Sequence, residues 1–477
     1  MFQENLRRTK IVATVGPVSQ SEEMIVRLIE AGVNVFRLNF SHGDHASHLR
    51  VIRTIQKIRQ QKDLPIAILQ DLSGPKIRVG EIKGDALELR AGEQLILDAS
   101  LNQPGEGNVV GVNYPHFADD VYVGARLLLA DGDLELKVVK VEPPRVVCEI
   151  VRGGRLSSHK GVNFPSGSFN IPALTQKDVK DLEFGLTHGV DMVAMSFVRS
   201  ATDLEDAHGV FQRMGRTIPL IAKIEKHEAL EQLEAIIEKA DGIMVARGDL
   251  GVEVEVERVP VLQKEIIRKS NLMAKPVITA TQMLRSMVES PYPTRAEVTD
   301  VANAILDGSD AVMLSEETAV GKYPVHAVEM MVKVARQVER IYPFLRSKLQ
   351  KVAGRSADPT DSVAHSAVVL AQDIHAPLLI TVTRSGYTAR KISHLRPEGY
   401  IFALTPDDEV YYRLSLLWGV IPAKYPLEHD LNKLMTDAVH MAKQRNLIRK
   451  GEAYVLTSGF PLGAPGSINQ ITGDVVR

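Results

Sequence analysis

The sequence is poor in several features that mark specialised classes of protein. Its 477 residues include one cysteine, Cys148, and one tryptophan. A single thiol cannot form a disulfide within the chain, and we expect Cys148 to be a small buried hydrophobic residue rather than a nucleophile. The 57 basic residues nearly balance the 59 acidic ones, so the formal net charge is -2. No basic run is long enough to follow a phosphate backbone, and we expect no nucleic-acid partner.

Long apolar stretches are also missing. The amino-terminal residues MFQENLRRTKIVATVG contain no run that resembles a signal peptide, and no segment approaches the length of a membrane span. We therefore expect no membrane contact and a cytoplasmic location. Hydrophobic residues make up 44% of the chain, enough for a large core. The chain length predicts about three domains.

An alternation of apolar runs and helix-patterned segments dominates the chain. Segments 21–31, 44–62 and 175–189 have helical spacing. The eight apolar runs that read as strands lie at 10–16, 33–40, 66–72, 191–198, 220–225, 242–247, 276–282 and 311–317. Eight strands that alternate with helices predict an α/β fold of the (β/α)₈ TIM barrel type.

The alternation breaks twice. Between residues 75 and 171, short runs punctuated by Gly, Pro and Asn turns, with no convincing helix, predict an inserted all-β domain after the third strand. After about residue 340 the apolar period is lost, and four further strand-like runs alternate with helical stretches. We predict a catalytic barrel at 1–74 and 172–342, a β-barrel lid domain at 75–171, and a C-terminal α/β regulatory domain at 343–477.

Charged residues stand where two apolar strands end. Lys223 and Glu225 close the run LIAKIE, and Asp249 follows the run GIMVAR. Because burying charge is costly, and because barrel active sites lie at the carboxyl ends of the strands, these residues predict a catalytic rim. Two carboxylates from neighbouring strands suit Mg²⁺ or Mn²⁺, and Lys223 would stabilise charge on an oxygen or phosphoryl group. The ordinary alternative is a structural ion pair.

Other polar residues end most of the remaining strands. They are Arg37, Asn39, Ser41, Asp71, Thr279, Thr281, Ser315 and Glu317. A single strand-end Asn or Thr more often satisfies a turn, so the inference rests on the joint pattern. Arg37 and Arg78 add phosphate-binding capacity, and the turn at Gly248 could hold a substrate carboxylate on free N–H groups. The residues alone predict metal-assisted chemistry on a small phosphorylated acid.

A series of motifs carries a family resemblance. These motifs are RLNFSHG (37–43), DLSGPKIR (71–78), KGVNFP (160–165), AKIEKHEA (222–229), ARGDLGVE (246–253), TATQML (279–284), PTRAEVTDVANA (293–304) and DGSDAVMLSEETAVGKYP (307–324). They resemble those of the pyruvate kinase family, in the same order and over essentially the whole chain. The resemblance implies phosphoryl transfer from phosphoenolpyruvate to ADP, giving pyruvate and ATP in the final step of glycolysis, and a homotetramer.

The resemblance also implies roles for individual residues. Glu225 and Asp249 would hold Mg²⁺ or Mn²⁺, and Lys223 would stabilise the transferring phosphoryl group and the enolate. The substrate contacts implied are Arg37, Lys223, Gly248, Asp249 and Thr281. The proton route implied is Thr281 with Ser315 and Glu317 through water. The nucleotide contacts implied are Asn39, Phe40, Ser41, His42, Arg78 and Lys160. We expect the insert, hinged near Gly74 and Pro172, to close over the nucleotide.

The chain departs from the family pattern at a monovalent-cation pocket. Many members bind K⁺ near the positions of Asn39, Ser41 and Asp71 and carry a glutamate where this chain has Lys76. Leu72 also replaces a threonine common in the K⁺-requiring motif. We therefore expect that K⁺ is not required, because the Lys76 ammonium occupies its place. The alternative is a surface lysine without a role.

The loop of Thr383, Arg384, Ser385, Gly386 and Thr388 resembles the effector phosphate site of the family. The last loop, FPLGAPGSINQ (460–470), lacks the basic residue expected to hold the second phosphate of fructose 1,6-bisphosphate. A sugar monophosphate or AMP is the expected effector, and a simple helix cap is the alternative. Two other functions stay open: a Mg²⁺-dependent lyase or aldolase acting on a pyruvate-like acid, and a catalytically inactive metabolite sensor.

Overall fold

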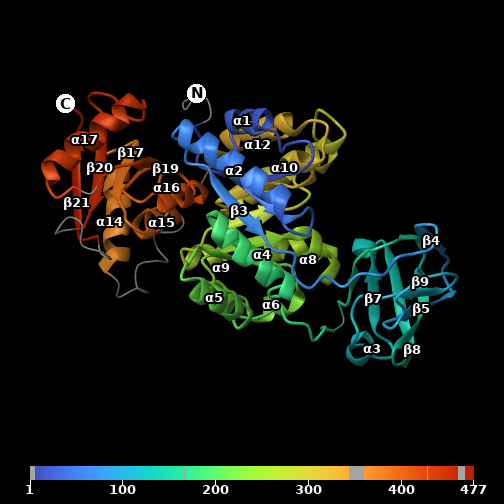
Figure 1. Cartoon of the computed structure of the whole chain (residues 1–477). Helices are drawn as coiled ribbons and strands as arrows, with labels where there is room; N and C mark the ends of the chain where they lie inside the picture. The colour runs from blue at the N-terminus through green and yellow to red at the C-terminus, as the bar shows by residue number, and fades with distance from the viewer. Residues whose placement is uncertain (1–5, 166, 343–358, 427, 460–467) are drawn as a thin grey trace.

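The computed structural model describes residues 6–165, 167–342, 359–426, 428–459 and 468–477 (Figure 1). They form a central barrel, an inserted β domain on one side of it and a C-terminal α/β domain on the other. This arrangement confirms the predicted fold class. The predicted domain bounds stay predictions, and the bound at 342/343 adjoins residues that are not described. No helix in the described ranges is long and apolar enough to cross a membrane.

Eight parallel strands close the barrel. They are β1 Lys10–Val15, β2 Val35–Asn39, β3 Ala67–Asp71, β12 Met192–Met195, β13 Leu220–Ile224, β14 Gly242–Ala246, β15 Val277–Ala280 and β16 Ala311–Leu314. Every predicted run contains one of these strands, and each strand pairs with its sequence neighbours across the closed sheet. The strands end sooner than the predicted runs where polar residues begin the turns, as at Ser315.

Helices cover the outside of the barrel (Figure 1). The longer ones are α1 Glu22–Ala31, α2 His45–Gln61, α4 Gln176–His188, α5 Asp203–Met214, α9 Val259–Leu272, α10 Arg295–Asp307 and α12 Pro324–Glu339, and α7 Leu233–Lys239 is a shorter one. Shorter helices, α6 His227–Glu231, α8 Arg247–Glu253 and α11 Glu316–Ala319, begin directly after strands at the rim. Capping boxes at Asp44, Thr175 and Thr294 start α2, α4 and α10 because each cap side chain accepts an otherwise unpaired backbone N–H.

The inserted domain, which we call the lid, has its own hydrophobic core. Its strands are β4 Ala86–Leu89, β5 Gln94–Asp98, β6 Val109–Gly111, β7 Arg126–Leu129, β8 Leu134–Glu142, β9 Arg145–Arg152, β10 Gly154–Ser157 and β11 Val162–Asn163. They form a six-stranded sheet and a two-stranded ladder. Cys148 lies in this core, and burial raises the pKa of its thiol to about 12. A four-residue helix, α3 Phe117–Asp120, was not predicted because so short an element shows no helical period.

The C-terminal domain contains a five-stranded sheet flanked by helices. Its elements are α14 Pro359–Asp373, β17 Leu378–Val382, α15 Tyr387–His394, β18 Tyr400–Thr405, α16 Asp408–Arg413, β19 Val420–Lys424, α17 Leu431–Gln444, β20 Ala453–Ser458 and β21 Gln470–Val475. Strand β21, an antiparallel edge strand, was not predicted because it lacks a buried apolar pattern. Trp418 is fully buried, as expected of a core residue.

A buried ion pair joins this domain to the barrel. The Arg396 guanidinium donates to both carboxylate oxygens of Asp310, at 2.8 and 3.0 Å, and to the carbonyl oxygen of Gly308. Arg396 is fully buried, and Asp310 immediately precedes β16.

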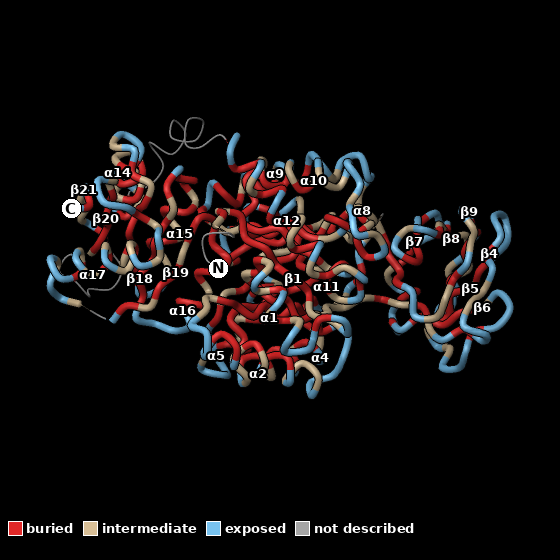
Figure 2. Tube along the Cα trace, turned by 90° about the horizontal axis from the view of Figure 1, so that it is seen from above, coloured by how far each residue is buried: buried red, intermediate tan, exposed pale blue. Residues whose placement is uncertain are grey.

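Figure 2 shows buried residues concentrated in the barrel, with smaller groups in the two outer domains. The largest buried core therefore belongs to the barrel, whose strand ends form the rim.

Candidate active site

A cleft of about 830 Å³ lies at the carboxyl ends of the barrel strands. It is lined by rim residues that come from separate parts of the sequence. The predicted site residues among them are Arg37, Asn39, His42, Lys76, Gly248, Asp249, Thr281, Ser315 and Glu317. Convergence of so many strand-end residues on one cleft is the arrangement that the sequence pattern predicted.

Behind this cleft lies a buried group of alternating charges. The Lys223 ammonium donates to Ser196 Oγ at 2.6 Å and lies 3.3 Å from Asp71 Oδ1 and 3.4 Å from Glu225 Oε2. Asp71 Oδ2 accepts a hydrogen bond of 2.6 Å from Arg37 Nε. Two cations and two carboxylates thus offset one another, which makes their burial possible.

The pKa values follow from burial and from these neighbours. Burial opposes the charge on Lys223, but Asp71 and Glu225 outweigh it and raise the pKa of the ammonium. Burial likewise acts against the charge on Asp71, but Lys223 and Arg37 hold the pKa of that carboxyl below its usual value. Lys223 is therefore charged at neutral pH, and it is held from several sides.

Glu225 differs from Asp71 because its burial is only partly compensated. Burial raises its pKa to about 7, Lys223 lowers it, and the charge of Asp249 raises it again. Its Oε1 accepts from the backbone N–H of Phe197 at 2.7 Å. Its Oε2 is buried and has no hydrogen-bond partner among the described residues. This oxygen has an ion pair with Lys223 but no hydrogen bond within the described ranges, and it lies in the field of a second carboxylate, Asp249. Such a buried carboxylate fits a divalent cation that prefers oxygen ligands.

Asp249 and Gly248 lie in the first turn of α8. The backbone N–H of Gly248 donates to Thr281 Oγ1 at 2.8 Å. Thr281 has a left-handed backbone, with φ of 68°, which is costly for a β-branched residue. Arg247 stabilises this turn by donating to the carbonyl oxygen of Thr281 at 2.8 Å while it pairs with Asp300 at 2.6 Å. The Thr281 hydroxyl is thereby held at the start of α8.

Glu317 is almost completely buried and lines the cleft beyond β16, the strand next to β15. Its Oε2 accepts from the backbone N–H of Ser315 at 2.7 Å, and its Oε1 accepts from that of Leu284 at 3.0 Å. Both oxygens therefore fix rim loops. Ser315 and Thr281 line the same cleft, as predicted.

The residues expected to face a nucleotide fall into two groups. Asn39 and His42 line the cleft, and Asn39 Oδ1 accepts from the backbone N–H of Ser41 at 3.1 Å. The Phe40 side chain is buried, so it can offer a ligand only its backbone. Arg78 and Lys160 lie in segments that connect strands of the lid. Neither is among the described residues that line this cleft.

Lys76 does not lie against the expected monovalent-cation pocket. Its ammonium is 3.3 Å from Asp131 Oδ1 of the lid and 3.4 Å from Asp249 Oδ1 of α8. Asp71, the carboxylate of that pocket, faces Arg37 and Lys223 instead. Whether K⁺ is required stays a prediction.

Comparisons with known proteins bear on the identity of this site. The family described as "Pyruvate kinase, barrel domain" matches residues 6–328 of this chain. The family described as "Pyruvate kinase, alpha/beta domain" matches residues 361–472. The chain belongs to the pyruvate kinase family. This finding confirms the family and the enzyme class predicted from the motifs, and it favours a kinase over a lyase or aldolase.

Individual pyruvate kinases are similar over nearly the whole of this chain. Pyruvate kinase 2 of Synechocystis sp. is 46% identical over 99% of this chain and 80% of the relative. The pyruvate kinase of Agrobacterium vitis is 45% identical, covering 99% and 97%, and that of Thermotoga maritima is 42% identical, covering 98% and 99%. The crystal structure of a pyruvate kinase from Cryptosporidium parvum superimposes with a TM-score of 0.93 at 35% identity, covering 99% of this chain and 96% of that one.

Some residues of this pyruvate kinase site were missed by reasoning from sequence. Ser196 donates to the carbonyl oxygen of Leu72 and accepts from Lys223, and Thr14 Oγ1 accepts from Arg37 at 3.0 Å. Both lie at or near strand ends, where the rim pattern could have found them. Lys177, which donates to the carbonyl oxygen of Phe40 at 2.7 Å, comes from an outer helix and has no such signal.

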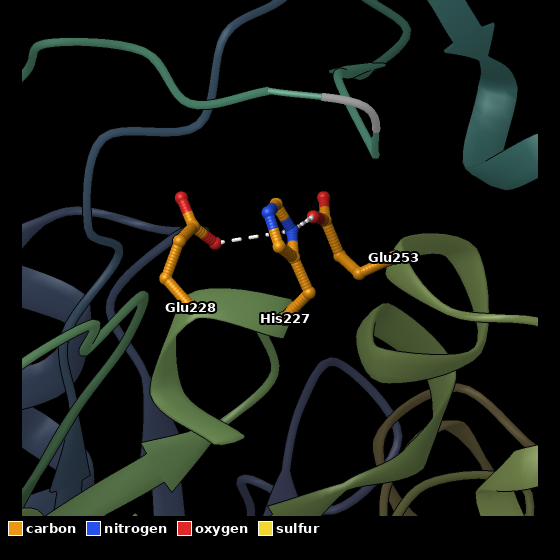
Figure 3. A group of neighbouring side chains, drawn as sticks. All are labelled: His227, Glu228 and Glu253. Carbon is orange, nitrogen blue, oxygen red and sulfur yellow. Dashed lines mark hydrogen bonds and ion pairs between the residues drawn. The ribbon is translucent and has the colours of Figure 1, made fainter. Parts of the chain in front are cut away.

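A second polar cluster lies between α6 and α8 (Figure 3). His227 Nδ1 is 3.2 Å from Glu228 Oε2 and 3.2 Å from Glu253 Oε2, a spacing that a metal ion could use. However, Glu253 Oε1 accepts from Lys226 at 2.8 Å and from Asn163 of the lid at 2.9 Å. The hydrogen bond to Glu253 raises the pKa of His227. We interpret the cluster as an ion-pair network that joins the lid to α8.

The predicted effector loop lies between β17 and α15. Thr383 Oγ1 accepts from the backbone N–H of Gly386 at 2.9 Å, and Ser385 Oγ accepts from that of Tyr387 at 3.4 Å. Thr388 is buried in the first turn of α15. The N-cap of α15 is Gly386, which has no side chain to make a cap hydrogen bond, so these contacts are turn hydrogen bonds within the loop. They leave both of the predicted alternatives open. Residues 460–467 of the last loop lie outside the described residues.

Proposed function

We propose that this protein transfers the phosphoryl group of phosphoenolpyruvate to ADP, giving pyruvate and ATP, and that Glu225 and Asp249 hold the required Mg²⁺ or Mn²⁺. The observation that carries the proposal is the buried ion pair of Lys223 with Glu225, whose Oε2 accepts no hydrogen bond from the described residues, behind a cleft lined by Asp249. When bound, the divalent cation supplies positive charge to the substrate's phosphate and to its enolate oxygen.

Lys223 and Arg37 supply fixed positive charge in this reaction. Lys223 is oriented by Ser196 and Asp71, so its ammonium needs little rearrangement to stabilise charge on the transferring group. Arg37 is anchored by Asp71 and Thr14, and it presents part of its guanidinium to the cleft. Phosphoryl transfer requires mainly that the reacting groups are positioned and that their charge is neutralised, and this set of residues provides both.

Thr281 is the proposed source of the proton that converts the enolate to pyruvate. Its hydroxyl lies 2.8 Å from the Gly248 nitrogen and donates to the carbonyl oxygen of Ala280 at 2.6 Å. Ser315 lines the same cleft and extends the route toward water. Glu317 uses both oxygens on backbone N–H groups, so we assign it a positioning role rather than direct proton transfer.

The nucleotide would lie against the turn from Asn39 to His42, under the lid. Asn39 and His42 line the cleft, and Ser41 is held by the Asn39 side chain. Arg78 and Lys160 would reach the phosphates after the lid, hinged near Gly74 and Pro172, closes and excludes water.

One coupled assay tests this function against its rivals. Pyruvate release is measured from phosphoenolpyruvate with and without ADP. We expect release only with ADP, and we expect Glu225→Gln to abolish it together with Mn²⁺ binding. Pyruvate formed without ADP, or from a different acid, would instead support the lyase or aldolase.

We also propose that K⁺ is not required. Support comes from Asp71, which already forms ion pairs with Arg37 and Lys223. These two cations offset its negative charge, so the attraction that remains for K⁺ is weak. Turnover is measured in a potassium-free tetramethylammonium buffer. Full activity is expected there, and a large activation on adding K⁺ would refute the idea.

We also propose that a sugar monophosphate or AMP regulates the enzyme by binding at the loop from Thr383 to Thr388. Ser385→Glu should abolish activation by such an effector because the added carboxylate repels a phosphate. Activation that survives this change would place the effector elsewhere. We further propose a cytoplasmic homotetramer, which sedimentation and cell fractionation would test.

A further inference from the structure

Lys76 lies at the boundary between the lid and the metal-binding helix proposed above. Its ammonium bridges Asp131, in a turn of the lid, and Asp249, in the first turn of α8. All three residues line the active-site cleft. The bridge therefore occupies the space from which a substrate or cation would approach Asp249.

The bridge gives Asp249 a substitute cation. Among the described residues, Lys76 is the only basic side chain within ion-pair distance of Asp249. Although burial opposes its charge, Asp249 and Asp131 raise the pKa of Lys76, so the ammonium stays charged. Glu225, the other proposed ligand, makes its ion pair with Lys223. Each of the two carboxylates thus has its own lysine partner when no divalent cation is bound.

The Lys223 and Lys76 side chains differ in how tightly their contacts hold them. Lys223 is held by Ser196 and Asp71 as well as by Glu225, and it is nearly buried. Lys76 has two carboxylate partners, at 3.3 and 3.4 Å, and its side chain is about one-quarter exposed. A small movement would take the Lys76 ammonium away from Asp249 and leave it on Asp131. Lys76 can therefore exchange partners, whereas Lys223 is fixed.

We propose that Lys76 is an internal competitor of the divalent cation: it neutralises Asp249 in the metal-free enzyme and must withdraw toward Asp131 of the lid before a divalent ion can bind. The proposal rests on the function proposed above. A divalent cation repels a neighbouring ammonium, so the divalent cation and the Lys76 ammonium cannot both bind Asp249 favourably. Lys76 would thus lower the affinity of the free enzyme for metal.

The same exchange would connect the metal to the lid. Asp131 belongs to the 3-10 turn Ala130–Gly132, and a Cβ atom added at Gly132 would lie 3.8 Å from Val252 of α8. The lid turn already contacts the helix that carries Asp249. When Lys76 withdraws from Asp249, its pair with Asp131 stays within the lid, so metal binding releases one of the contacts between lid and barrel.

The test is binding of Mn²⁺ to the full-length, substrate-free enzyme at constant ionic strength, followed by the loss of the free Mn²⁺ signal in electron paramagnetic resonance. Lys76→Met should bind Mn²⁺ about tenfold more tightly, a typical size for a coupling between two ligands. Asp131→Asn should bind it several-fold more weakly, because Lys76 is then left with Asp249 alone. Lys83→Met is the matched control, since Lys83 forms an exposed ion pair with Glu106 within the lid, and it should change nothing.

Two further variants separate the possible failures. Asp249→Asn should lose Mn²⁺ binding. If it does, and Lys76→Met binds Mn²⁺ with unchanged or reduced affinity, the competition is refuted while the proposed metal site stands. If Asp249→Asn binds Mn²⁺ normally, the metal site itself is wrong, and the inference falls with it. Lys76→Gln, compared with wild type by thermal unfolding, checks that the effect of removing the charge does not come from misfolding.

Discussion

Replacing Glu225 by Gln separates what this residue does for the fold from what it does for the metal. Glu225 is fully buried, its Oε1 accepts from the Phe197 N–H, and its Oε2 has no hydrogen-bond partner among the described residues. Glutamine keeps the size of the side chain and an acceptor for that N–H. The substitution removes the negative charge, which the buried site compensates incompletely, and puts an amide nitrogen in place of one carboxylate oxygen.

The effect on stability follows from the pKa of Glu225, which burial raises from 4.5 to about 7. Below pH 4.5 the carboxyl is protonated in both the folded and the unfolded chain, so it has no effect. As pH rises from 4.5 to 7, the unfolded chain loses the proton first, and the folded metal-free protein loses stability. Above pH 7 the difference in pKa corresponds to about 3 kcal/mol.

Glu225→Gln should therefore be more stable than the wild type in chelator. The difference in free energy of unfolding should grow between pH 5 and pH 7 and then level off near 3 kcal/mol at most. Added Mn²⁺ should reverse the order, because a ligand that binds only the folded state stabilises it by mass action, and the variant has lost a ligand atom. Activity should disappear at every pH.

Thermal unfolding in chelator at four pH values, repeated with millimolar Mn²⁺, measures both effects. Glu316→Gln is the control, since Glu316 is at the same rim but is 56% exposed, and its curves should follow those of the wild type. A Glu225→Gln variant that is less stable than the wild type at pH 8 in chelator would refute the reasoning. So would equal stabilisation of both proteins by Mn²⁺.

Three other changes have defined outcomes. Lys223→Met should lower kcat by at least about 10³-fold while Mn²⁺ still binds, which steady-state kinetics and Mn²⁺ titration would check; a near-normal kcat would rule out its role. Gly74→Ala should cost about 1–3 kcal/mol of stability, because Gly74 has a φ of 66° and the new Cβ would lie 2.5 Å from Phe197. Gly84→Ala, at a similar φ of 77° but in open space, should lower the melting temperature less, and equal losses would contradict the steric argument. Arg396→Met should cost about 3–5 kcal/mol because it leaves Asp310 buried without its partner, and calorimetry showing an unchanged melting temperature would contradict this.

The sequence by itself determined the architecture of this protein. A barrel strand is a short apolar run followed by a helical segment, and such local patterns can be read without knowing their partners. For the same reason, the rim positions of Lys223, Glu225 and Asp249 were predictable, since charge at the end of a buried barrel strand is costly and is typical of an active-site rim. Where the pattern was too short or too polar, as in α3 and β21, the prediction failed.

Only the tertiary structure decided which charges meet. The sequence could not pair Asp71 with both Arg37 and Lys223, bring Lys76 to Asp249 instead of Asp71, or join Asn163 of the lid to Glu253 of the barrel. Each of these contacts joins residues far apart in the chain. Their side chains meet because the barrel closes and the lid lies against α8, and the pKa of Glu225 depends on that enclosure as much as on its own chemistry.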